Sequence, residues 1–113
     1  MQIGVTSQNF RTITGHAGKT RRFIVFSSDD NKQWLETDRL DLSKEMAMHN
    51  FKGTDHPVDR LNVIITASCG DGFLRKMASR GIEVIQTAES DPMTAVNKFV
   101  DGQPLKPAEK HRH

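Results

Sequence analysis

The second half of the chain alternates short apolar runs with amphipathic stretches, and this order limits the possible folds more than any other feature. The apolar runs at residues 61–66 and 82–86 are typical of strands. Residues 71–80 and 92–101 carry apolar side chains at helical spacing, and a glycine follows each stretch. A strand–helix–strand unit places its two strands in parallel through a right-handed crossover. We therefore predict parallel strands packed against two helices.

The first half of the chain contributes three further predicted strands. Residues 2–6 form a short β-like run, and residues 22–28 and 33–40 flank a turn rich in Asp and Asn, as in a hairpin. Apolar and polar residues alternate after Trp34, which favours a half-buried strand. The predicted fold class is therefore α/β, with a five-stranded mixed sheet flanked by helices, and a length of 113 residues suits a single domain.

The predicted secondary structure is less well defined between the two halves of the chain and after residue 102. Residues 43–51 are ambiguous, because Ser43 could cap a short helix there. The sequence Asp55-His56-Pro57 is typical of the start of another helical turn. After residue 102 the chain is polar and contains Pro and Lys, so we predict a structured domain over 1–102 and a flexible tail over 103–113.

Charge and cysteine content narrow the possible partners. The net charge of +2 is too small to indicate nucleic-acid binding, yet residues 1–28 contain no acidic side chain. The basic residues of this segment, among them Arg11, Lys19 and Arg22, indicate either an anionic ligand or a solvated basic loop. The single cysteine, Cys69, excludes a disulfide within the chain and a metal site built from four thiolates of one chain.

The sequence shows neither the pattern of a membrane-spanning segment nor that of a signal peptide. Every apolar stretch is far shorter than the ~20 residues that span a bilayer. The opening MQIGVTSQNF lacks the basic-then-apolar pattern of a signal peptide. We therefore expect a soluble, cytoplasmic protein with neither membrane nor nucleic acid among its partners.

A glycine-containing turn, Cys69-Gly70-Asp71-Gly72, joins the strand at 61–66 to the following helix. Ligands of open α/β sheets bind at the carboxyl ends of strands, and a helix N-terminus offers free backbone N–H groups to anions. Glycines at Gly70 and Gly72 would let the backbone approach a ligand closely. The alternative is a tight turn without a ligand. Cys69 is either a thiolate favoured by the helix end or a small buried residue.

The five histidines do not show the spacing of a zinc site. His16 is the best candidate ligand, because glycines flank it in a loop that also carries basic residues. His49 is a second candidate, on the ambiguous segment. His111 and His113 belong to the predicted tail, where surface exposure is the simpler interpretation.

Signatures of common enzymes are missing, because the sequence has neither a G-x-S-x-G elbow nor paired carboxylates on its strands. The order of elements also suits a ribonuclease-H-like sheet, but a two-metal nuclease needs a cluster of carboxylates. We therefore expect a protein that is not an enzyme.

Several motifs, taken in order, resemble one known family. They are I-G-V-T-S, T-G-H-A-G-K-T-R-R-F-I-V-F, E-M-A-M-H-N-F, D-H-P-V-D-R-L-N-V-I-I-T-A-S-C-G-D-G-F and R-G-I-E-V-I-Q-T-A-E-S-D-P-M-T-A-V-N-K-F-V-D-G. Together they cover residues 2–102 and resemble the dinitrogenase iron–molybdenum cofactor biosynthesis family, which includes NifX-like proteins, the C-terminal part of NifB and the orange protein.

The resemblance implies a ribonuclease-H-like fold without nuclease activity. It also implies that the protein binds an iron–molybdenum cofactor, or an iron–sulfur precursor cluster, and hands it on to nitrogenase assembly proteins. The family's loop histidine falls on His16, and its glycine turn falls on Gly70 and Gly72. His49 and Cys69 do not fall on family-wide positions, so they are weaker candidate ligands.

Two functions from different classes remain open at this point. The first is a metallocluster carrier, in which Arg11, Lys19 and Arg22 balance the charge of the cluster and His16, His49 and Cys69 supply metal ligands. A carrier must release its cargo, so the scarcity of thiolates suits this function. The second is a protein-interaction domain of the same fold that binds no cluster.

Overall fold

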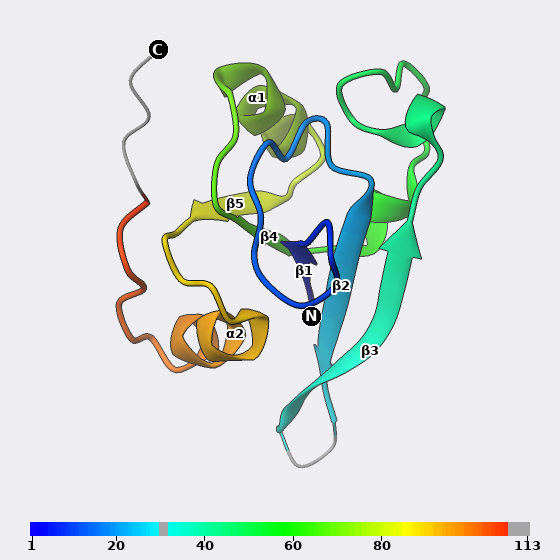
Figure 1. The fold of residues 1–113 in the computed structure, drawn as a ribbon. Helices are drawn as coiled ribbons and strands as arrows, with labels where there is room; N and C mark the ends of the chain where they lie inside the picture. Colours follow the sequence, from blue (N-terminus) through cyan, green and yellow to red (C-terminus); the bar gives the residue numbers. More distant parts are fainter. Residues whose placement is uncertain (30–31, 109–113) are drawn as a thin grey trace.

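The computed structural model describes residues 1–29 and 32–108, and His111 and His113 lie outside this part of the chain. Five strands form one sheet in the order β3-β2-β1-β4-β5. Two helices, α1 (Asp71–Ser79) and α2 (Pro92–Val100), pack on opposite faces of the sheet (Figure 1). The predicted α/β domain with a mixed sheet and two helices is therefore confirmed.

Three neighbouring strands, from the centre of the sheet to one of its edges, are parallel. They are β1 (Gln2–Thr6), β4 (Val63–Thr66) and β5 (Glu83–Gln86), and β4 lies between the other two. Parallel strands joined by a helix are covered on both faces, so β4 is buried at all four of its positions. Because these strands run in the same direction, their carboxyl ends meet at one edge of the sheet.

The hairpin of β2 (Arg22–Ser28) and β3 (Trp34–Asp41) adds the antiparallel half of the sheet. Along β2, alternate side chains enter two separate cores. Phe23 and Val25 pack beneath α1, whereas Ile24 and Phe26 pack against α2. This period of two places Arg22 on the α2 side, at the start of the strand.

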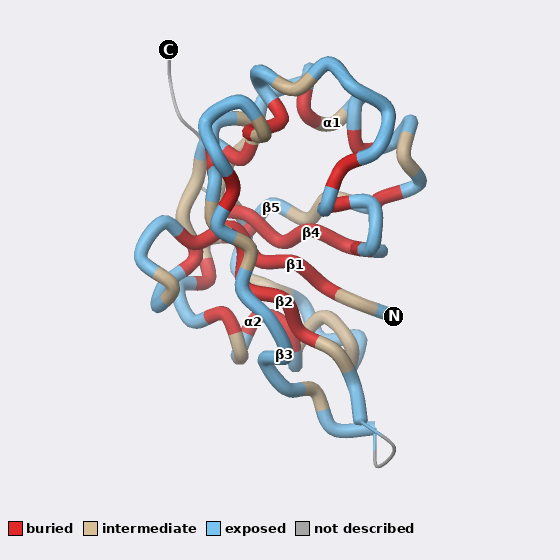
Figure 2. The backbone as a smooth tube through the Cα atoms, turned by 90° about the vertical axis from the view of Figure 1, so that its right-hand side faces the viewer, coloured by how far each residue is buried: buried red, intermediate tan, exposed pale blue. Residues whose placement is uncertain are grey.

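The structure differs from the half-buried pattern expected for residues 33–40. Five consecutive residues of β3, 35–39, are exposed, and Figure 2 shows this strand largely in the exposed colour. The physical reason is that β3 is an edge strand with a bulge, since Val25 pairs with Asp38 and Phe26 with Glu36. The amide of Arg39 donates to the Asp38 carboxylate at 2.7 Å, so this N–H group is already paired within β3.

Two single turns of 3₁₀-helix lie between β3 and β4. The ambiguous segment contains only Lys44–Met46 in helical form, and the Ser43 side chain does not cap it. The second turn, Pro57–Arg60, begins where the sequence predicts, and the imidazole of His56 accepts a hydrogen bond from the Val58 amide at 3.0 Å. Neither α-helix in the described part of the chain is long and apolar enough to cross a bilayer.

The chain after residue 102 makes contacts of its own beside the end of β5. The carbonyl oxygen of Lys106 accepts hydrogen bonds from the Thr87 hydroxyl at 2.7 Å and from the Ala88 amide at 3.1 Å. Thr87 also pairs with Pro107 in an antiparallel bridge. The domain boundary at residue 102 and the flexibility of 103–113 stay predictions.

Glu89 connects this last segment to α2. Its side chain is 5 % exposed, and its carboxylate accepts hydrogen bonds from the Lys98 ammonium at 2.7 Å and from the Lys106 amide at 3.2 Å. The hydrogen bond from Lys98 lowers the pKa of the Glu89 carboxyl, although burial opposes this effect.

We predict that Glu89→Gln lowers the melting temperature at pH 7 and that this difference narrows in acid. A lowered carboxyl pKa adds stability above the ordinary carboxyl pKa, and that stability is lost as the pH falls through the lowered value. Thermal melts of wild type and variant from pH 7 to pH 3 measure the difference. A difference that stays constant over this range would show that the Glu89 charge does not contribute.

Candidate functional site

Two loops meet at the edge where the parallel strands end. The loop between β1 and β2, residues 7–21, is the histidine loop and carries Gly15-His16, and the turn after β4 carries Ser68-Cys69. The Ala17 amide donates to the Ser68 carbonyl at 3.1 Å, and the His16 amide donates to the Ser68 hydroxyl at 2.9 Å. The chain direction of the parallel strands therefore brings the predicted histidine loop and the predicted glycine turn together.

Two buried threonines at the strand ends hold these loops in place. The hydroxyls of Thr6 on β1 and Thr66 on β4 lie 2.7 Å apart, and neither residue is exposed to solvent. The Thr6 hydroxyl donates to the Thr14 carbonyl at 2.6 Å. The Thr14 carbonyl also accepts from the Ala67 amide at 3.1 Å, so the middle of the histidine loop is bonded to both strand ends. Buried hydroxyls that are fully paired in this way make the loop position specific.

The segment that carries His49 forms a third wall. The His49 amide donates to the Gly18 carbonyl at 2.6 Å, which joins the two histidine-bearing segments directly. On the other side of this segment, the Lys76 ammonium of α1 donates to the Met48 carbonyl at 2.9 Å. The histidine loop, the His49 segment and α1 are therefore linked around a common space.

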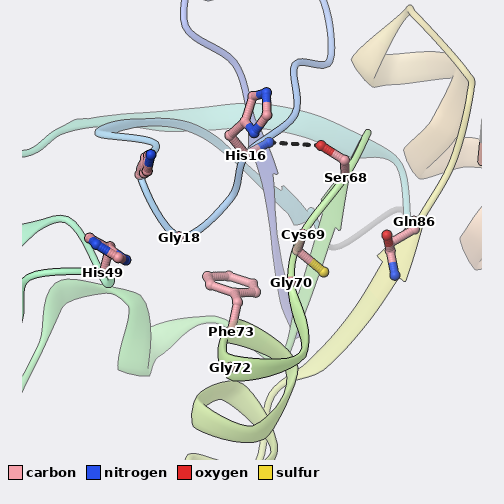
Figure 3. A pocket seen from close by; sticks show the side chains of 10 residues that line it. His16, Gly18, His49, Ser68, Cys69, Gly70, Gly72, Phe73 and Gln86 are labelled. Atoms are coloured by element: carbon pink, nitrogen blue, oxygen red, sulfur yellow. Dashed lines mark hydrogen bonds between the residues drawn. The ribbon is translucent and has the colours of Figure 1, made fainter. Parts of the chain in front are cut away.

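That space is a pocket of about 580 Å³. Figure 3 shows the Phe73 ring in the middle of the lining residues, with His16 and Ser68 on one side, His49 on another and Gln86 beyond Cys69. The described residues that line the pocket are His16, Gly18, Lys19, His49, Ser68, Cys69, Gly70, Gly72, Phe73 and Gln86. Four segments far apart in the sequence thus contribute to one pocket.

The amino end of α1 faces the pocket without a capping side chain. Gly70 is the N-cap residue, and it has no side chain that could accept from the first backbone N–H groups. A Cβ atom added at Gly70 or at Gly72 would meet nothing within 4 Å, so neither glycine is required by packing. The backbone N–H groups and the partial positive charge of the helix end are therefore available to an anion.

Cys69 is half-buried next to this helix end. Burial raises the pKa of its thiol, and the negative charge of Asp71 raises it further. Of the two interpretations of Cys69 that the sequence leaves open, its environment favours the neutral thiol over the free thiolate. A metal that binds the sulfur would have to displace the proton.

The structure gathers six of the eight predicted site residues around the pocket, and these are His16, Lys19, His49, Cys69, Gly70 and Gly72. Arg11 and Arg22 are not among the described lining residues. The Arg22 guanidinium donates to the Gln8 carbonyl at 2.9 Å and lies 5.3 Å from the centre of the Phe10 ring. Arg11 is exposed elsewhere on the same loop.

Sequence reasoning missed four lining residues, namely Gly18, Ser68, Phe73 and Gln86. Gln86 was detectable, because it ends a strand that is parallel to β4 and must reach the same edge. Phe73 has the apolar helical spacing of a core residue, and it does belong to the core beneath α1. The isolated Ser68 carries no sequence signal that distinguishes it.

The candidate metal ligands do not converge on one point. Within residues 1–29 and 32–108, no three His, Cys, Asp or Glu side chains are placed to hold a metal ion together. In Figure 3 the imidazoles of His16 and His49 lie apart, and the Cys69 sulfur lies on the side of Phe73 that is away from His49. Such an arrangement does not fit a single ion, but separated donors can contact different atoms of a larger ligand.

Comparison with solved structures shows that other proteins share this fold. A Methanocaldococcus jannaschii protein described as a dinitrogenase is 16% identical with a TM-score of 0.67, over 97% of each chain. The apo form of the orange protein from Desulfovibrio gigas is 19% identical with a TM-score of 0.62, over 97% of this chain and 96% of that one. A Thermotoga protein described as a NifB protein is 12% identical with a TM-score of 0.62, over 98% and 97%.

The sequence itself carries the stronger assignment. No curated protein matches the chain. The family described as "Dinitrogenase iron-molybdenum cofactor" matches residues 1–102, which include every strand, both α-helices and the whole pocket lining. The chain therefore belongs to the dinitrogenase iron–molybdenum cofactor family.

Proposed function

We propose that this protein binds an anionic iron–sulfur or iron–molybdenum cluster and hands it on to nitrogenase assembly proteins in the cytoplasm. The observation that carries the proposal is the pocket of about 580 Å³ that collects His16, His49 and Cys69 from three separate segments. Imidazole nitrogen and cysteine sulfur are donors that suit iron and related metals. The family to which the chain belongs supports a cofactor of this kind.

The charge of the pocket favours an anion. Lys19 lines it, the amino end of α1 opens onto it, and none of the ten described lining residues is acidic. The Asp71 carboxylate in the first turn of α1 opposes this effect, since it raises the pKa of Cys69. A metal–sulfide cluster with net negative charge is stabilised by such surroundings. A single divalent cation is disfavoured by them, which agrees with the missing three-residue metal site in the described part of the chain.

The spread of the donors suits transfer rather than permanent storage. A cluster contains several metal atoms, so His16 and His49, which lie apart in the pocket lining, can bind different atoms. Two imidazoles and one thiol hold a cluster less firmly than four thiolates do. The cargo can therefore pass to an acceptor protein that offers stronger ligands.

Anaerobic incubation with extracted iron–molybdenum cofactor, followed by gel filtration and metal analysis, tests this proposal. We predict that the wild-type protein elutes with molybdenum and iron, and that Gly72→Val and Gly70→Val reduce the bound metal at least fivefold. A Cβ atom at either position would meet nothing within 4 Å, and Gly70 has a φ of −91°, which any residue can adopt. Folding should therefore change little, and thermal melts run beside the binding assay check this.

Two results would contradict the proposal. Equal loss of stability and binding in both variants would indicate that the glycines serve only the fold. Elution of the wild-type protein without metal would favour the second function, a domain of the same fold that docks on assembly proteins and binds no cluster.

A further inference from the structure

Ser68, on the turn after β4, is hydrogen-bonded to the histidine loop through both its side chain and its backbone. Its hydroxyl accepts a hydrogen bond from the His16 amide at 2.9 Å, which is the dashed line in Figure 3. Its carbonyl accepts a hydrogen bond from the Ala17 amide at 3.1 Å. The same residue is half-buried and lines the pocket. Both bonds converge on the peptide groups that flank the His16 side chain.

His16 has a backbone conformation that needs such support. Its φ is 55°, and only two other non-glycine residues in the described part of the chain have a positive φ. A side chain in the left-handed region is disfavoured and persists where surrounding contacts fix it. On the far side of His16, its carbonyl accepts the amides of Lys19 at 2.9 Å and Thr20 at 3.1 Å. The peptide groups on both sides of the Cα atom are therefore hydrogen-bonded.

Gly15 allows the serine to come this close. A Cβ atom at Gly15 would lie 2.3 Å from the Ser68 hydroxyl oxygen and 3.3 Å from the Ser68 Cβ atom. The backbone of the loop thus rests directly on the Ser68 side chain. Neither residue alone explains the contact, because the glycine provides the space and the serine provides the acceptor.

We propose that Ser68 is a positioning residue of the pocket. Its hydroxyl fixes the backbone of His16 in the left-handed region, so that the imidazole is presented at the rim before the cargo arrives. The inference rests on the proposed function, because it assigns Ser68 a part in holding the same cluster. Ligands that are ordered in advance bind more tightly, since less conformational freedom is lost on binding.

Three variants separate positioning from a general structural role. Ser68→Ala removes the acceptor, Ser68→Thr keeps a hydroxyl at the same position, and His16→Ala removes the imidazole through which Ser68 is proposed to act. In the protein without cargo, amide hydrogen exchange measured by NMR should accelerate at least tenfold at His16 in Ser68→Ala and stay near the wild-type rate in Ser68→Thr. Thermal melts confirm that each variant is folded.

Anaerobic titration with extracted iron–molybdenum cofactor then measures the effect on the cargo. We expect Ser68→Ala to weaken binding about fivefold in the wild-type background and less than twofold in the His16→Ala background, and Ser68→Thr to restore most of the affinity. A fivefold loss in both backgrounds, or unchanged affinity in folded Ser68→Ala, would overturn the positioning role alone. Failure of the wild-type protein to bind the cofactor would overturn the proposed function and the role of Ser68 with it.

Discussion

Replacing His16 by alanine should weaken the affinity for extracted iron–molybdenum cofactor at least tenfold at pH 8 while leaving the fold intact. His16 is exposed at the rim of the pocket, and the hydrogen bonds that hold its loop involve its backbone, which alanine retains. Alanine therefore removes only the candidate metal ligand. Anaerobic titration, with thermal melts of both proteins, measures the two effects separately.

A second histidine variant provides a control for this prediction. His49→Ala is the matched substitution, since His49 lines the pocket from a different segment of the chain. Affinity that is unchanged in folded His16→Ala would remove His16 from the site and leave His49 and Cys69 as candidates.

The second large effect is expected at Gly15, where Gly15→Val should abolish cofactor binding and destabilise the protein by about 1–3 kcal/mol, as overpacking does. The added Cβ would lie 2.3 Å from the Ser68 hydroxyl oxygen and 3.4 Å from the Ser68 backbone nitrogen. The Ser68 hydroxyl must rotate away and give up its bond to the His16 amide, and the 3.3 Å contact with the Ser68 Cβ atom then pushes the histidine loop off the β4–α1 turn.

Gly18→Ala is the matched control for folding on the same loop. Its added Cβ would lie 3.9 Å from the His49 Cβ atom and 4.0 Å from a Phe73 ring carbon, which is ordinary contact. Urea unfolding of both variants should therefore show a loss of stability for Gly15→Val and a near-wild-type value for Gly18→Ala. Equal stability of the two variants would show that the loop does not need its close contact with Ser68.

The regular elements were predictable because their signals are local. The predicted strand at 61–66 and helix at 71–80 end within two residues of Val63–Thr66 and Asp71–Ser79. A strand–helix–strand unit also dictates parallel strands, and this placed the two loops at one edge. The exposure of β3 was not predictable from alternation, since it depends on the strand's position at the edge of the sheet and on a bulge.

The sequence predicted which loops meet at the site, because the direction of the strands determines this. It did not predict which side chains of those loops face the pocket. Lys19 and Arg22 are three positions apart in the sequence, yet only Lys19 lines the pocket. Arg22 begins a strand, so the period of two turns its side chain toward the α2 face, where Asp41 and Phe10 engage it. The sequence alone could not place His49 beside His16, because the main-chain bond to Gly18 that brings it to the pocket leaves no trace in the sequence.

The central claim is that the pocket between the histidine loop and the β4–α1 turn holds the cluster. An anomalous difference map at the iron absorption edge, from crystals grown anaerobically with the cofactor, tests this claim most directly. We predict a strong iron peak inside the pocket, within bonding distance of His16 or His49 and facing the amino end of α1. An iron peak on the α2 side, near Phe10 and Arg22, with the pocket empty, would contradict the account.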